Sequence, residues 1–165
     1  MNAKRILIAT DFSNKAGAAL DYASSLARDA GATLYIVHVG HFPVANTDWS
    51  SFGLGASGYV PELDNLDEVR NRLSAITPTV DGVSHEHRYL EGDPADEIVD
   101  FARRENIDLI VMGTHGRTGL DHVLLGSVAE AVVRHAHCPV LTVKQPATQP
   151  PTAAESPHEV HASIG

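Results

Sequence analysis

Residues 108–128 read DLIVMGTHGRTGLDHVLLGSV, and the interpretation of the whole chain starts from this segment. A short apolar run, 109–112, stops at Gly113, and a polar loop with further glycines leads to Gly126 and Ser127. Glycine allows positive φ and close approach of a ligand to the backbone. Free N–H groups at a helix start attract anions, and a serine there can cap the helix or bind a phosphate oxygen. The segment predicts a strand, a loop and a helix, and the loop either holds an anion such as phosphate or only turns the chain.

The chain before residue 145 alternates between apolar runs and segments with helical periodicity. Strands are expected at 5–10, 33–39, 83–90, 109–112 and 140–143. Apolar spacings of three and four residues predict helices at 16–30, 63–76, 94–102 and 128–136. Gly31 is expected to end the first helix, and Asp93 with Pro94 to begin the third. Alternation of this kind predicts an α/β fold, a Rossmann-like doubly wound sheet of five parallel strands with helices on both faces.

The third expected strand, residues 83–90, is mostly polar, whereas a central parallel strand should be apolar on both faces. It therefore belongs at an edge, which leads to the strand order 3-2-1-4-5. Strand order then reverses between the first and fourth strands, where such folds bind ligands. Asp11 and Gly113 end those two strands, so we expect them to flank one crevice.

Composition narrows the class of protein. The 165 residues carry a formal net charge of −9, which argues against binding nucleic acid or an anionic membrane through a basic face. The apolar run near the start is shorter than a signal peptide needs, and no run approaches the roughly 20 residues of a membrane span. The single cysteine, Cys138, excludes an internal disulfide and suits a reducing interior. We expect a soluble, cytoplasmic protein.

Two segments do not follow the alternating pattern. Residues 40–60 have no clear period and are rich in glycine and serine, so either a functional loop or a mobile insertion fits them. Residues 145–165 include four prolines and no apolar period, which predicts a disordered tail after a domain of residues 1–144.

Several motifs resemble the universal stress protein family. The pattern Gly113-x2-Gly116-x9-Gly126-Ser127 is similar to the ATP-binding pattern of that family, without gaps. Further similarities lie at Ile8-Ala-Thr-Asp11-Phe-Ser13, His38-Val39, Gly92-Asp-Pro-Ala95 and Cys138-Pro-Val140. The resemblance covers roughly residues 3–144; the 40–60 segment and the tail lie outside the family pattern.

The resemblance implies a Rossmann-like domain that binds ATP, or AMP and ADP more weakly, with Mg²⁺ or Mn²⁺ held mainly by the phosphates. The nucleotide-binding residues that it implies are Ala9, Thr10, Asp11, Val37, His38, Val39, Met112, Gly113, His115, Gly116, Arg117, Gly126, Ser127 and Val128. In this assignment Asp11 contacts ribose or adenine, and the backbone of 37–39 borders adenine. Residues 112–117 line ribose and phosphates, and residues 126–128 hold the phosphates.

Three functions remain open. No Walker-type lysine follows the last glycine of the motif, because Val128 comes after Ser127. We therefore expect a nucleotide-responsive, stress-response regulatory protein with no catalytic residues. One alternative is a slow ATPase or other nucleotide hydrolase, to which His115 and Arg117 would contribute. The other is a scaffold that recruits a protein partner through residues 40–60.

The histidines and the last strand bear on metal ligands and on partner chains. The histidine pairs 85/87 and 135/137 lack a second chelating pair at structural-zinc spacing, so no metal site is expected. The last strand, 139–144, is apolar yet expected at an edge, where it invites pairing with another chain. This predicts a homodimer, which the family resemblance also implies.

Overall fold

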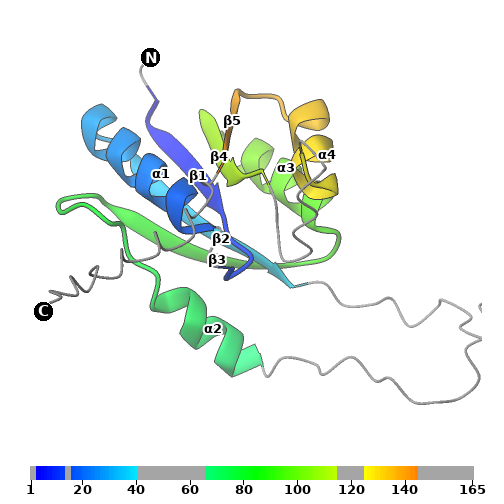
Figure 1. Cartoon of the computed structure of the whole chain (residues 1–165), viewed down its shortest axis with the longest axis horizontal. Helices are drawn as coiled ribbons and strands as arrows, with labels where there is room; N and C mark the ends of the chain where they lie inside the picture. Colours follow the sequence, from blue (N-terminus) through cyan, green and yellow to red (C-terminus); the bar gives the residue numbers. More distant parts are fainter. Residues whose placement is uncertain (1–2, 14–15, 41–65, 115–124, 145–165) are drawn as a thin grey trace, which may run out of the picture.

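The computed structural model describes residues 3–13, 16–40, 66–114 and 125–144. Five parallel strands form one sheet in the order β3-β2-β1-β4-β5, with helices on both faces (Figure 1). The elements are β1 (Arg5–Ala9), α1 (Ala16–Ala30), β2 (Thr33–Gly40), α2 (Leu66–Ser74), β3 (His85–Glu91), α3 (Pro94–Arg104), β4 (Leu109–Gly113), α4 (Ser127–His135) and β5 (Val140–Val143). The predicted fold class and strand order are confirmed.

Side chains of the three central strands alternate between two apolar cores. On one face Ile8 of β1, Ile36 of β2 and Val111 of β4 pack in the core that α1 and α2 cover. The helix α1 contributes small buried residues, including Ala19 and Ala23, so it can lie close to the sheet. Successive strand residues point to opposite faces, and the neighbours of these side chains therefore build the second core.

The second core lies between the sheet and the pair α3 and α4 (Figure 1). Leu7, Val37 and Ile110 enter it from the strands, and Ile98 and Val132 enter it from the helices. Both faces of β1, β2 and β4 are thus buried, which is why their sequences are nearly continuous apolar runs.

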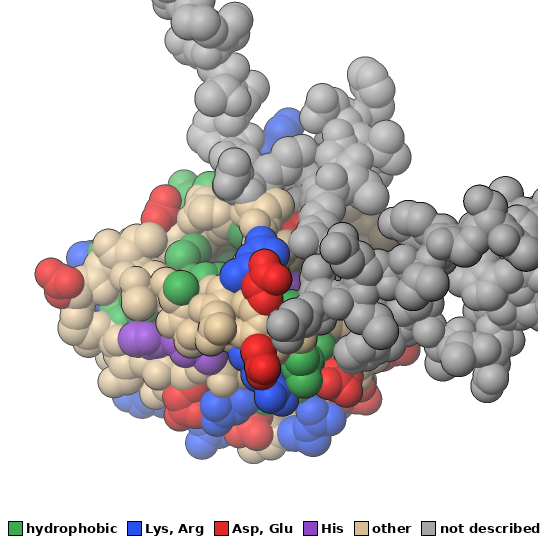
Figure 2. Space-filling view, turned by 90° about the horizontal axis from the view of Figure 1, so that it is seen from below, with side chains coloured by type: hydrophobic (Ala, Val, Ile, Leu, Met, Phe, Trp, Pro, Cys, Tyr) green, Lys and Arg blue, Asp and Glu red, His purple; other side chains and the backbone are tan. Residues whose placement is uncertain are grey.

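The strand β3 lies at an edge of the sheet, as its polar sequence predicts. It pairs in parallel with β2 alone, and its side chains are half-buried or exposed. Arg88 and Glu86 form an ion pair along it. On the side of the molecule that carries α2 and β3, acidic and basic side chains are interspersed (Figure 2).

The start of α3 and the end of α1 lie where their capping residues predict, whereas the end of α2 differs from its expected position. Asp93 is the N-cap of α3 with Pro94 as the first helical residue, and Gly31 ends α1 with a φ of 60°. The helix α2 was expected to reach residue 76 but ends at Ser74. A proline two residues after Ile76 disfavours helical geometry for the residue before it, so the last turn tightens instead of continuing.

Part of the expected organisation lies outside the described residues. This applies to most of the 40–60 segment, to residues 115–124 of the glycine-rich loop, and to the tail from residue 145. Within the described ranges, the helices are too short or too polar to cross a membrane.

Candidate functional site

A cavity of about 320 Å³ opens at the carboxyl ends of the strands, where β1 and β4 lie side by side. Eleven of the residues that the sequence assigned to the site line it: Ala9, Thr10, Asp11, Val37, His38, Val39, Met112, Gly113, Gly126, Ser127 and Val128. The other three, His115, Gly116 and Arg117, lie outside the described residues. The two sequence signals that we expected to flank one crevice, Asp11 and Gly113, do so.

The turn after β1 presents a carboxylate to the cavity. Its start is anchored because the Thr10 amide donates to the Val37 carbonyl of β2 at 2.9 Å. Asp11 accepts a hydrogen bond from the Ser13 amide through Oδ1 at 3.0 Å. Its other oxygen, Oδ2, is buried and has no hydrogen-bond partner within the described part of the chain. A buried acceptor without a partner is costly, so this oxygen is a candidate to accept from a ligand.

The start of α4 forms another wall of the cavity, from Gly126 to Ala129. Gly126 is the N-cap, and no side chain of the described residues caps the first turn of this helix. The Gly126 amide itself donates to the Thr114 carbonyl at 2.7 Å, which ties the helix start to the end of β4. The first amides of an α-helix have no partner within the helix, and they carry its positive dipole end. This wall is therefore suited to an anion.

Apolar side chains line much of the remaining wall. Val37 and Val39 come from β2, Met112 from β4, and Pro94 and Ile98 from α3. Sequence reasoning did not assign the two α3 residues to the site. One signal could have found them: the Asp93-Pro94 helix start follows β3, so it had to lie at the carboxyl edge of the sheet.

Ala16, Thr114 and Ala129 also line the cavity, although sequence reasoning did not assign them. Thr114 and Ala129 directly follow assigned residues, and Ala16 is the first residue of α1. Among the described residues, no group of three or more His, Cys, Asp or Glu side chains is placed to hold a metal ion.

Two groups with shifted pKa values lie away from the cavity. The Lys4 and Arg5 amides donate to Asp108 Oδ2 at 2.7 and 2.9 Å and lower the pKa of that carboxyl group. Burial raises the pKa of the Cys138 thiol, which packs against the core beneath α3 and α4. Both groups lie at the opposite, amino end of the sheet, before β4 and β5, and neither is among the residues that line the cavity.

The chain is a doubly wound α/β protein with a cavity where strand order reverses, the place at which folds of this class bind ligands. The chain belongs to the universal stress protein family, because the model of that family matches residues 2–144.

Individual relatives agree with this assignment. Universal stress protein MJ0531 of Methanocaldococcus jannaschii is 42% identical over 148 residues, which cover 87% of this chain and 83% of the relative. The solved structure of MJ0577, a universal stress protein of the same organism, superimposes with a TM-score of 0.72 at 30% identity, covering 90% of this chain and all of that one. The universal stress protein from Archaeoglobus fulgidus, solved in complex with dAMP, has a TM-score of 0.61 at 26% identity and covers 86% of this chain and 98% of its own.

Proposed function

We propose that this protein is a nucleotide-responsive regulatory protein of the stress response that binds ATP in the cavity, and AMP or ADP more weakly. One observation carries the proposal: Asp11, which has an unpartnered carboxylate oxygen, and the start of α4, which no described side chain caps, line the same cavity. A nucleotide matches both, because ribose hydroxyl and adenine amino groups donate hydrogen bonds and phosphates accept them.

The size and walls of the cavity support the same ligand. Its volume of about 320 Å³ is at the lower end of the range for small-molecule pockets, and Val37, Val39 and Met112 offer apolar surface to a base. Asp11 is the one carboxylate among the described lining residues, so a Mg²⁺ or Mn²⁺ ion would be held mainly by phosphate oxygens. The dAMP complex of the Archaeoglobus fulgidus relative supports an adenine nucleotide.

The assignment of phosphates to the start of α4 can be tested with two substitutions of one residue. Gly126→Asp places a negative charge at the N-cap, and Gly126→Asn places a neutral side chain of the same shape there. Gly126 has a φ of −68°, which both residues adopt. We expect Gly126→Asp to lower the affinity for ATP at least tenfold. The loss of affinity for Gly126→Asn should be several times smaller, because only aspartate repels the phosphates.

Binding is measured by calorimetry and by thermal shift with ATP and Mg²⁺. A ligand at 100 times its Kd stabilises the native protein by about 2.7 kcal/mol, so a true site gives a clear shift. Mass spectrometry of nucleotide released on denaturation adds a second readout: ATP indicates slow turnover, and ADP or AMP alone indicates hydrolysis. If ATP with Mg²⁺ produces no thermal shift and no heat in the native protein, the proposed function is wrong.

The proposed assembly is a homodimer, in which two copies of the chain pair through the outer edge of β5. Support comes from the position of β5 at the free end of the sheet and from its apolar sequence. The proposed location is the cytoplasm, where a lone thiol such as Cys138 stays reduced.

A further inference from the structure

The turn between β1 and α1, residues 10–13, lies between two cavities. The nucleotide cavity adjoins it on one side. A second cavity of about 490 Å³ adjoins the turn on the other side and lies between the helices α1 and α2. Its lining includes Phe12, Ser13 and Leu20. Thr10 lines both cavities. Close packing normally fixes the conformation of a buried segment. This turn has open space on both sides, so specific contacts must hold it.

The turn also contains an unfavourable backbone conformation. Phe12 has a φ of 61°, in the left-handed region that residues with a side chain rarely adopt. Such a conformation is unfavourable and persists only where the surroundings of the residue determine it. Within the turn, the Phe12 amide donates to Thr10 Oγ1 at 3.1 Å and the Ser13 amide donates to Asp11 Oδ1. These local bonds orient Asp11, but neither connects the turn to the sheet.

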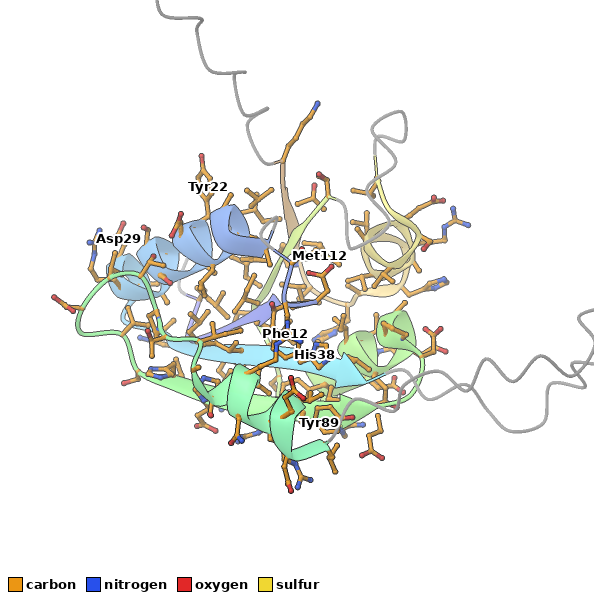
Figure 3. All side chains as sticks on the ribbon, turned by 60° about the horizontal axis from the view of Figure 1, so that its bottom comes forward. Phe12, Tyr22, Asp29, His38, Tyr89 and Met112 are labelled. Carbon is orange, nitrogen blue, oxygen red and sulfur yellow. The ribbon has the colours of Figure 1, made fainter. Side chains whose placement is uncertain are left out.

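His38 of β2 adds a side-chain connection to the backbone bond that the Thr10 amide makes with the Val37 carbonyl. Its Nδ1 lies 2.8 Å from the Thr10 carbonyl oxygen. A carbonyl only accepts, so Nδ1 carries the proton and donates. The His38 ring also lies 4.1 Å from the Phe12 ring, centroid to centroid, with the planes tilted by 37°. Figure 3 shows the two side chains beside each other at the carboxyl ends of β1 and β2, with Tyr89 of β3 beyond them.

The ring contacts extend into neighbouring elements. Tyr89 lies 6.1 Å from the His38 ring, and the Arg72 guanidinium of α2 lies 4.5 Å from the centre of the Phe12 ring. The turn therefore contacts β2 and α2 through aromatic and cation–π interactions at the point where its backbone is strained. Of these contacts, only the one with His38 combines a hydrogen bond to the turn backbone with a ring contact.

We propose that His38 is a positioning residue, which holds the β1–α1 turn so that Asp11 keeps its carboxylate at the wall of the nucleotide cavity. His38 acts through Asp11, and its importance for nucleotide affinity rests on the proposed function. The sequence resemblance placed His38 at the site through its backbone; the structure assigns its side chain to the turn.

Two substitutions separate the hydrogen bond from the ring. His38→Phe keeps a ring against Phe12 but removes the donor to the Thr10 carbonyl. His38→Asn keeps an N–H donor near the position of Nδ1 and removes the ring. We expect His38→Phe to weaken ATP binding about tenfold and His38→Asn to restore part of that loss, because the bond to the backbone fixes the turn.

A double-mutant cycle tests whether His38 works through Asp11. The double variant His38→Phe/Asp11→Ala should bind ATP within about twofold of Asp11→Ala, since the group being positioned is already absent. Tripolyphosphate, a probe of the phosphate end alone, should bind His38→Phe as well as it binds the native protein, because a carboxylate does not contact phosphate. Additive losses in the cycle would overturn the proposed route through Asp11.

Amide hydrogen exchange in nucleotide-free protein provides an independent readout. The Ser13 amide, which donates to Asp11, should exchange at least tenfold faster in His38→Phe than in the native protein. The Ile110 amide, which donates to the Pro139 carbonyl in the sheet at 3.0 Å, should be unchanged and thus serve as the control for global stability. Unchanged Ser13 exchange would overturn the inference whatever the ATP affinity. Faster Ser13 exchange would support the inference even if the protein bound no ATP. The absence of ATP binding would refute the proposed function but not the role of His38 in the turn.

Discussion

Gly17 and Gly31 lie near opposite ends of α1 and have different structural roles. Gly31 follows the helix with a φ of 60°. Its amide donates to the Arg28 carbonyl, and the Ala32 amide donates to the Ala27 carbonyl, which is the Schellman arrangement. Gly17 lies in the first turn, where an added Cβ would meet no atom within 4 Å. Of these two residues, only Gly31 needs to be glycine for conformational reasons.

Alanine substitutions should distinguish the two glycines. We expect Gly31→Ala to lower the free energy of unfolding by about 1–2 kcal/mol, because alanine disfavours the left-handed conformation. Gly17→Ala should leave it unchanged or raise it by up to about 1 kcal/mol, because alanine is the better helix former. Urea denaturation of both variants and the native protein checks this. Equal stabilities of the two variants would contradict the assigned role of Gly31.

Asp11 and His38 show how far single residues could be interpreted from sequence. The aspartate was placed at the crevice correctly, because its position at the end of a buried strand is a local property of the chain. The bond of His38 to the Thr10 carbonyl joins residues 28 positions apart, and no local pattern indicates it.

The helices α3 and α4 both begin at the cavity but have opposite capping. Asp93 Oδ1 accepts from the Ala95 and Asp96 amides at 2.9 and 3.2 Å, so the first turn of α3 is satisfied. The helix α4 begins at Gly126, and no side chain of the described residues caps it. Within that part of the chain its first amides are open to water or a ligand, at the cost of the stability that a cap would add.

Removal of the α3 cap should affect stability. We expect Asp93→Ala to lower the free energy of unfolding by about 0.5–2 kcal/mol, the usual effect of losing an N-cap side chain. The control is Asp96→Ala in the same first turn, which removes a favourable charge near the helix dipole and should lower it by less than about 1 kcal/mol. Chemical denaturation at neutral pH compares the two. A loss for Asp96→Ala as large as that for Asp93→Ala would show that charge, and not capping, stabilises this helix.

At the scale of the whole molecule, the edges of the sheet differ in character. The strand β3 carries charged side chains, whereas β5 reads Val-Leu-Thr-Val. The Pro139 and Val143 carbonyls accept from the Ile110 and Thr114 amides at 3.0 and 3.1 Å, so they point toward β4. Backbone groups alternate in direction along a strand, and those of Thr142 therefore point to the outer edge. A partner strand would hydrogen-bond there.

Thr142→Pro tests the proposed dimer. Proline removes the outward N–H of Thr142 and leaves the bonds between β4 and β5 in place, a position where an edge strand tolerates it. We expect the native protein to sediment as a dimer and Thr142→Pro to sediment as a folded monomer, with an unchanged circular dichroism spectrum. A monomeric native protein in light scattering or sedimentation would refute the dimer, and a dimeric Thr142→Pro would place the interface elsewhere.

The sequence alone determined the alternation of strands and helices, the edge position of β3, the Asp93 cap and the turn at Gly31. These features depend on residues close in the chain, through periodicity, propensity and capping. Only the tertiary structure decided that Pro94 and Ile98 join the cavity and that His38 holds the turn of Asp11. The two cavity residues and the His38 contact depend on distances between separate elements, which are set when the helices pack on the sheet and which no local pattern encodes.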